Sequence, residues 1–190
     1  MAVGSPAAPT SCRSGAGAVP LAAGVALDSR FVERLWAPWR LEYVQGADAQ
    51  EGCVFCRAAD GNDEEQLVVH RGERVFVLLN KFPYSAGHLL VAPYQHGLNF
   101  SDLPDADALE IHRLGAQGLA ALGAAYKPDG FNLGWNIGRI AGAGIPDHGH
   151  LHVVPRWAGD TNFMPVLGDV KVIPEHLAAT RRRLAEAWPR

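Results

Sequence analysis

The sequence predicts an α+β fold in which a mainly antiparallel sheet of about five strands is flanked by two helices. Short runs of β-branched and apolar residues fill the middle of the chain, as is typical of strands. One long stretch repeats its apolar residues at helical spacing, and the C-terminal segment has the composition of an Arg-rich helix. With 190 residues, 48% hydrophobic and 19% charged, the chain suits a single compact domain.

The N-terminal segment 1–27 consists almost entirely of Ala, Gly, Pro, Ser and Val. Such a segment buries too little apolar surface to become ordered. We therefore expect a disordered, low-complexity tail over 1–27 and one domain over 28–190.

The predicted domain begins with an aromatic segment. Asp28 is placed to cap a short helix, and Trp36 and Trp39 follow. The chain then becomes polar, and a tight turn is expected to carry the thiols of Cys53 and Cys56.

Five apolar and β-branched runs, each bounded by turn residues, are expected to form strands. They are residues 67–70, 74–80, 88–93, 131–136 and 150–154. The first two flank a turn at Arg71-Gly72-Glu73 and are expected to pair as a hairpin. Pro83 ends the second run, because proline cannot donate a hydrogen bond to a neighbouring strand.

Two helices are expected beside this sheet. Between Asp105 and Tyr126 the apolar residues recur at helical spacing, and Pro128-Asp129-Gly130 ends the pattern. Residues 169–188 are expected to form the helix that closes the chain.

Charge and cysteine usage exclude several classes of function. Seventeen Lys and Arg against twenty Asp and Glu give a formal charge of -3, so no broad basic field is available for nucleic acid. No uncharged apolar run approaches the ~18–20 residues that cross a bilayer, which predicts a soluble protein without a membrane anchor. Three cysteines are too few for a disulfide scaffold, so we expect a reducing compartment, the cytoplasm.

Three histidines alternate along the fifth expected strand. Side chains in a strand point to opposite faces in turn, so His148, His150 and His152 share one face while Leu151 and Val153 face the other. Neighbouring imidazoles bind a transition metal or perform nucleophilic and acid–base catalysis. The glycine-rich segment 136–144 precedes them, and the backbone N–H groups of such loops suit phosphate oxygens.

The heptapeptide His148-Gly149-His150-Leu151-His152-Val153-Val154 matches the pattern His-x-His-x-His followed by two apolar residues. In this the sequence resembles the histidine-triad (HIT) superfamily. Residues 79–83 and 87–91 resemble the nucleotide-binding strand pair of that family. Residues 35–40 and 155–157, with Asn162-Phe163, resemble its bacterial diadenosine tetraphosphate phosphorylase (ATP adenylyltransferase) branch.

The resemblance implies a role for each of the three histidines. His150 would attack the α-phosphorus of a nucleotide and form a covalent nucleotidyl-histidine. His152 would contact the α-phosphate and assist the leaving group, and His148 would support the arrangement. Inorganic phosphate or water would then release the nucleotide. Residues implied to bind the nucleotide are Asn80 at the ribose and Asn136, Gly142, Ala143 and Gly144 at the phosphate.

One departure from the family pattern bears on the reaction. Many hydrolytic members carry Gln and then Ser or Thr shortly before the triad, where this sequence has Gly144 and Ile145. This favours phosphorolysis of a dinucleoside polyphosphate over hydrolysis. A HIT-type nucleotide hydrolase on the same site is the near alternative, and a non-catalytic nucleotide- or zinc-binding module is the alternative from another class.

Cys53 and Cys56 have the C-x2-C spacing that lets two thiolates chelate one zinc ion. Two unliganded thiols are the simpler alternative, and a redox pair would prefer the N-terminus of a helix that follows a strand. Zinc-containing HIT proteins add two histidines to such a pair, and the resemblance implies His96 and His148 for these ligands. We expect a structural Zn²⁺ site, because four protein ligands leave no position open for substrate.

The resemblance also implies a homodimer that forms by extension of the sheet. Among the other histidines, His88 is expected to be a wall of the nucleotide pocket without a catalytic role. Surface positions without partners are expected for His70, His112 and His176.

Overall fold

The computed structural model describes residues 52–160 and 175–189. The predicted tail, the capped helix after Asp28 and the segment with Trp36 and Trp39 lie outside the described residues, as do Asn162 and Phe163. Within the described ranges, no helix combines the length and the apolar character needed to span a membrane.

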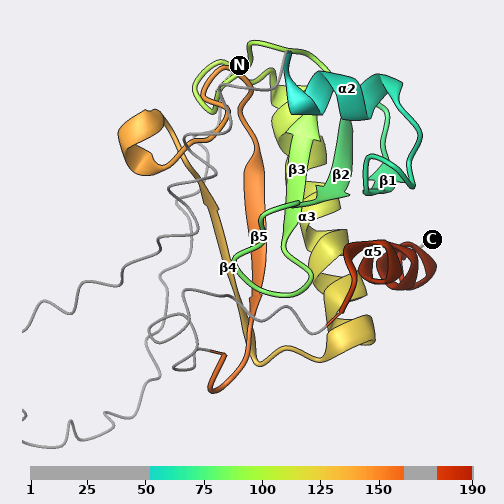
Figure 1. Ribbon diagram of the computed structural model, residues 1–190. Coiled ribbons are helices and arrows are strands. Elements are labelled where there is room, and N and C mark those ends of the chain that lie inside the picture. Colours follow the sequence, from blue (N-terminus) through green and yellow to red (C-terminus); the bar gives the residue numbers. More distant parts are fainter. Residues whose placement is uncertain (1–51, 161–174, 190) are drawn as a thin grey trace, which may run out of the picture. The chain divides into compact units, whose positions relative to one another are not determined.

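The described residues contain one five-stranded antiparallel sheet, as predicted (Figure 1). Its strands are β1 Val68–Arg71, β2 Val75–Leu79, β3 Leu89–Pro93, β4 Gly130–Trp135 and β5 Leu151–Arg156. The order across the sheet is β1-β2-β3-β5-β4, so β1 and β4 form its two edges. A register shift between Val68 and His70 interrupts the β1–β2 pairing.

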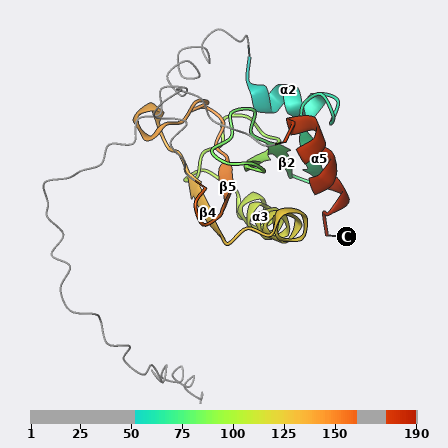
Figure 2. The same cartoon turned by 60° about the horizontal axis from the view of Figure 1, so that its bottom comes forward.

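The two faces of the sheet pack against different helices. On β2, the side chains of Val75, Val77 and Leu79 join the larger apolar cluster, which includes residues of α3 Asp105–Tyr126 and α5 Leu177–Glu186. Phe76 and Leu78 point the other way and pack with α2 Val54–Asp60. Figure 2 shows α2 and α3 on opposite sides of the sheet. The predicted histidine motif lies on the α2 face.

The prediction for the Cys53–Cys56 turn is wrong, and three α-helices rather than two accompany the sheet in the described residues. Cys53 is the N-cap of α2, and Cys56 lies in its first turn. A helix of seven residues is too short to display a helical period, and burial of Phe55 and Ala58 stabilises it instead.

The two longer helices compare differently with their predictions. The bounds of α3 are those predicted, and the helix ends where Lys127 takes a left-handed conformation and donates its N–H to Gly123 O at 3.2 Å. The C-terminal helix begins at Leu177, later than the predicted start at residue 169. Glu175 and His176 are not helical, and residues 169–174 lie outside the described ranges.

Side chains of α5 and its preceding residue attach the helix to the rest of the domain. Arg181 donates Nε–H to Val68 O at 2.7 Å and so covers the edge of β1. Glu175, just before α5, accepts hydrogen bonds from the hydroxyls of Tyr126 and Thr180 and pairs with Arg183 at 3.3 Å. No helix covers the backbone edge of β4 in the part of the chain that is described.

Candidate active site

The three histidines of the motif share one face, although only His152 lies within a strand. His148 and His150 precede β5, which begins at Leu151, so the predicted start of this strand is one residue early. Leu151 and Val153 pack in the cluster of α3, and all three histidines are buried on the opposite face. The alternation predicted from the sequence therefore extends through the residues before the strand.

Gly149, between His148 and His150, allows this segment to approach the neighbouring loop closely. A Cβ at this position would lie 2.7 Å from Leu98 O and 3.0 Å from Asn99 Cα. The Gly149 N–H donates to the same carbonyl at 2.8 Å. Only glycine fits this close approach without a backbone shift.

His150 is held so that one ring nitrogen is occupied. Its Nδ1 lies 2.9 Å from His148 O, and a carbonyl only accepts, so Nδ1 carries the proton. The lone pair is therefore on Nε2. Burial lowers the pKa of His150, an effect that exceeds the hydrogen bond to His148 O, which raises it. The imidazole is thus favoured in its neutral, nucleophilic form.

His88 is completely buried and bonded to His152, a partnership that sequence reasoning missed. The Tyr84 N–H donates to His88 Nδ1 at 3.1 Å, so the proton of this ring lies on Nε2. His88 Nε2 is 3.0 Å from His152 Nδ1 and donates to it. His152 consequently carries its own proton on Nε2. The register that pairs Leu90 with His152 places His88 on the same face, and the sequence does not show this pairing.

The predicted nucleotide-binding asparagines lie beside these rings. Asn80 accepts the Phe82 N–H at 2.9 Å, and its Nδ2 is 3.3 Å from His88 Nδ1. Asn136 donates to Tyr84 Oη and to Gly142 O, both at 3.4 Å. The ring of Tyr84 in turn stacks on His152, with centroids 5.8 Å apart. Tyr84 therefore links the triad to the glycine-rich loop.

The glycine-rich loop is compact and contains the 3-10 helix Arg139–Ala141. The amides of Gly142 and Ala143 donate within the loop, to Arg139 O at 2.9 Å and Gly138 O at 3.3 Å. Phosphate binding by these two amides would therefore require the loop to rearrange.

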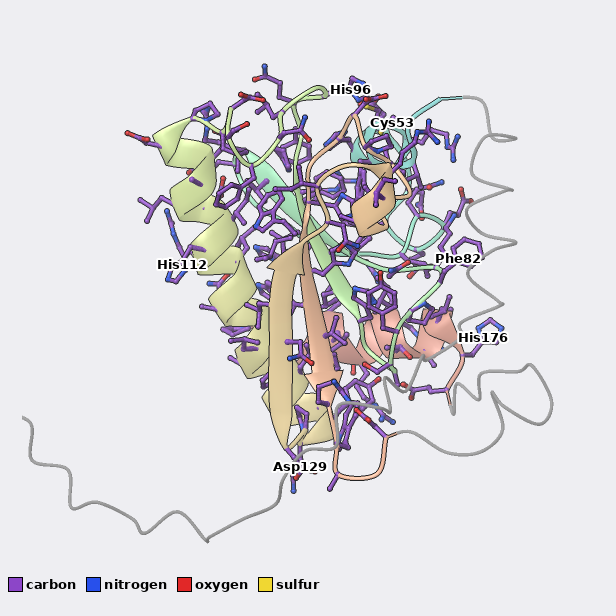
Figure 3. The ribbon with its side chains drawn as sticks, turned by 90° about the vertical axis from the view of Figure 1, so that its left-hand side faces the viewer. Cys53, Phe82, His96, His112, Asp129 and His176 are labelled. Carbon is purple, nitrogen blue, oxygen red and sulfur yellow. The ribbon has the colours of Figure 1, made fainter. Side chains whose placement is uncertain are left out.

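A second group of side chains brings together the four predicted metal ligands. Cys53, Cys56, His96 and His148 offer ligand atoms that all lie within 4.8 Å of one another. His148 Nδ1 is 3.4 Å from Cys53 Sγ and 3.3 Å from His96 Nδ1, and Cys56 Sγ is 3.5 Å from His96 Nδ1. Figure 3 shows Cys53 and His96 at the same end of the sheet.

These three separations fit a tetrahedral ion, and the 3.9 Å between Cys56 Sγ and His148 Nδ1 is slightly longer. Zinc bonds of about 2.0–2.3 Å place the ligand atoms about 3.3–3.8 Å apart. His148 Nε2 donates to Pro93 O at 2.8 Å, which directs Nδ1 toward the thiols. Desolvation and the Cys53 thiol raise the pKa of Cys56, whereas a redox-active pair has a lowered one. Although the pair lies at a helix N-terminus, the histidine nitrogens that converge on its two thiols favour metal over redox chemistry.

The other face of the sheet has a separate cavity of about 500 Å³, between the β1–β2 turn and α3. His70, which lines it, is half-buried and stacks on Trp188 with centroids 4.9 Å apart, so the surface position predicted for it is wrong. His112 and His176 are exposed, as predicted. The cavity shares no residue with the triad or the Cys/His group.

The chain matches a known protein family over about half of its length. The family model of the HIT domain matches residues 62–159, a range that contains the three histidines and His88. The chain belongs to the HIT domain family. The AP-4-A phosphorylase of Mycobacterium tuberculosis is 40% identical to it over 167 residues, which cover 84% of this chain and 86% of that protein.

Solved HIT structures agree with the fold. A hypothetical histidine triad nucleotide-binding protein from Sulfolobus tokodaii is 27% identical, with a TM-score of 0.57 over 71% of this chain and 91% of that one. A Zn-bound histidine triad family protein from Mycobacterium smegmatis is also 27% identical, with a TM-score of 0.57 over 72% and 92%.

Proposed function

We propose that this HIT domain protein is a nucleotidyl transferase that phosphorolyses dinucleoside polyphosphates such as diadenosine tetraphosphate. The observation that carries the proposal is the buried His150, whose Nδ1 is bonded to His148 O while its Nε2 holds the lone pair. The activity named for the M. tuberculosis relative, which is similar over most of both chains, supports the choice of substrate.

In the first step, His150 Nε2 attacks the α-phosphorus and forms a P–N bond. The bond from phosphorus to the bridging oxygen breaks, and the electron pair leaves with the polyphosphate. The His150 ring becomes cationic, and the hydrogen bond from Nδ1–H to His148 O stabilises this charge. The Nε2–H of His152, oriented through His88, donates a hydrogen bond to the charged oxygens of the leaving group.

In the second step, an oxygen of inorganic phosphate attacks the nucleotidyl phosphorus. The P–N bond breaks, its electron pair returns to His150 Nε2, and a nucleoside diphosphate is released. Water in place of phosphate gives the nucleoside monophosphate. In this proposal Asn80 contacts the ribose. Asn136 and the amides of Gly142, Ala143 and Gly144 contact the phosphate once the loop has rearranged.

We further propose that Cys53, Cys56, His96 and His148 hold one structural Zn²⁺. The support is the convergence of the four ligand atoms and the Pro93 carbonyl that orients His148. Bound zinc would supply no reaction step and would pin α2 to the residues before β5. Free thiols kept for a metal also fit a reducing compartment such as the cytoplasm.

A homodimer through the edge of β4 is the assembly that we propose. β4 is an edge strand, and Leu133 in it is 48% exposed. An exposed edge with apolar side chains is a ready template for a second strand. The other edge, β1, already has Arg181 bonded to its backbone.

Intact-protein mass spectrometry after an acid-free quench tests the proposed reaction. The protein is mixed with diadenosine tetraphosphate, with and without inorganic phosphate, and wild type is compared with His150→Ala. We expect a transient AMP adduct on wild type alone, and ADP plus ATP as products when phosphate is present.

Two other results would change the assignment. AMP plus ATP in the presence of phosphate would make the protein a hydrolase on the same site. Tight nucleotide binding without adduct or turnover would make it a non-catalytic nucleotide-binding module.

A further inference from the structure

Phe55 lies between the two thiols in the sequence and contacts two rings of the triad. Its side chain is 1% exposed and is part of the apolar cluster beneath α2. The centroid of its ring is 4.9 Å from that of His148 and 4.6 Å from that of His150, with interplanar angles of 40° and 41°. The contact to His150 is closer than the 4.8 Å between the rings of His150 and His152.

A single hydrogen bond leaves the tilt of the His150 ring incompletely determined. The bond from Nδ1–H to His148 O fixes which nitrogen faces the carbonyl. The second side-chain torsion of histidine has a broad minimum, so the plane of the ring can still rock about that bond. Attack on phosphorus requires the Nε2 lone pair to point along the bond that forms, and small errors of alignment slow the reaction. Packing on the ring face is what limits such rocking.

We infer that Phe55 is a positioning residue that holds the His150 ring at the angle needed for attack. This inference rests on the proposed function, since it concerns the nucleophile of that reaction. Phe55 belongs to the same helical turn as Cys53 and Cys56, so the segment that carries the thiols also sets the tilt of the nucleophile. Phe55 is 1% exposed, so we expect its effect in the chemical step rather than in substrate binding.

Phe76 is a matched control for this test. It is 0% exposed, lies in the same apolar cluster as Phe55 and also makes a ring contact, but with Tyr94 at 5.0 Å. Among the described ring contacts, none joins Phe76 to a triad histidine. Leucine at either position removes an aromatic ring of the same size from the same cluster, so general effects on packing should be similar.

The experiment compares wild type, Phe55→Leu and Phe76→Leu as full-length, zinc-loaded proteins. Quench-flow measures the rate of AMP-adduct formation on His150, steady-state kinetics give KM and kcat, and melting curves give Tm. We expect Phe55→Leu to slow adduct formation about 10- to 100-fold with KM changed less than about 2-fold. Phe76→Leu should lower Tm about as much as Phe55→Leu does. It should leave the adduct rate within about 2-fold of wild type.

Nuclear magnetic resonance of ¹³C-labelled histidine provides a readout that does not depend on activity. The His150 ring signal is assigned by its loss in His150→Ala. Loss of the Phe55 ring should let the His150 ring rock more freely and so change the relaxation rate of this signal, and Phe76→Leu should leave that rate unchanged. If wild type forms no adduct, the proposed function fails, and this comparison still decides whether Phe55 positions His150.

Two results would overturn the inference. The first is an equal effect of both leucine variants on the adduct rate and on the His150 signal, which would make Phe55 ordinary core. The second is a loss of zinc from Phe55→Leu with full recovery of the adduct rate in excess zinc, which would assign the ring to the metal site alone.

Discussion

Both ring nitrogens of the buried His88 have hydrogen-bond partners. The Tyr84 N–H and the Asn80 amide lie against Nδ1, and His152 accepts from Nε2. His88, which directly precedes β3, thereby determines which nitrogen of His152 carries its proton. A change at His88 should therefore act on the reaction through His152.

We predict that His88→Leu slows formation of the AMP adduct about 10- to 100-fold, because His152 loses the donor that fixes its tautomer. Rapid-quench measurement of the adduct rate checks this. His70→Leu is the control, since His70 is a half-buried histidine whose contact, with Trp188, lies away from the triad. An unchanged rate in His88→Leu would restrict His88 to packing.

The residues of the site differ in how far the sequence could predict them. His148, His150 and His152 could be placed on one face because strand alternation depends only on position in the chain. His88 could not be connected to His152, because that contact depends on the pairing of β3 with β5, and the sequence does not state which strands are neighbours.

At the scale of elements, long periodic segments were predictable and short ones were not. The bounds of α3 were predicted because its apolar residues repeat over 22 residues. The helix α2 was missed because its seven residues are stabilised by tertiary burial of Phe55 and Ala58 rather than by a pattern of their own. β5 runs on to Arg156 and includes Pro155, which strand rules place at a strand end.

The helix α2 is the element that zinc would secure. We predict that wild type binds one zinc ion per chain and that Cys56→Ser binds zinc at least about 10-fold more weakly and melts at a lower temperature. Elemental analysis after dialysis and melting curves check both effects. The control is Cys12→Ser, which changes the third cysteine of the chain, outside the C-x2-C pair. Zinc retained in Cys56→Ser but lost in His150→Ala would assign the metal to the triad His148, His150 and His152 instead.

The attachment of α5 to α3 should depend on pH at the alkaline end. Burial, followed by the hydrogen bond to Glu175, raises the pKa of Tyr126 from 10.0 to about 12. Between these values the unfolded chain loses the phenolic proton while the folded chain keeps it, so the stability that this group contributes falls as the pH rises from about 10 to about 12. Below pH 10 the contribution is fully present.

We therefore expect Tyr126→Phe to be less stable than wild type by about 1 kcal/mol at pH 8, the usual value of such a hydrogen bond. The difference should shrink as the pH approaches 12. Urea unfolding of both proteins at a series of pH values measures this difference, in which the titration of other groups cancels. A difference that stays constant across the alkaline range would contradict the role given to Tyr126.

For the whole molecule, the two faces of the sheet are used differently. One face holds α3, α5 and the larger apolar cluster, and the other holds α2, the triad and the four predicted zinc ligands. Packing that stabilises the fold and groups that perform chemistry are thus largely separated by the sheet. Substitutions in the larger cluster should affect stability more than the chemical step.

We predict that wild type has about twice the chain mass of 20.4 kDa in solution and that Leu133→Lys shifts it toward the monomer. Size-exclusion chromatography with light scattering measures the mass. Leu109→Lys is the matched control, because Leu109 is 61% exposed and lies on α3 rather than on β4. A wild-type protein that is monomeric at all concentrations would refute the β4 interface.

The hydrogen bond from Arg181 to the β1 carbonyl of Val68 would limit the proposed pairing to one edge of the sheet. A sheet with two free edges can add copies at both ends and grow into a fibre. A sheet with one blocked edge joins a second copy once, and the pair then has no free edge left to offer. In the proposed pair, Arg181 on α5 would hinder the addition of a strand at β1, and Arg181→Ala should leave the Val68 carbonyl open to further pairing.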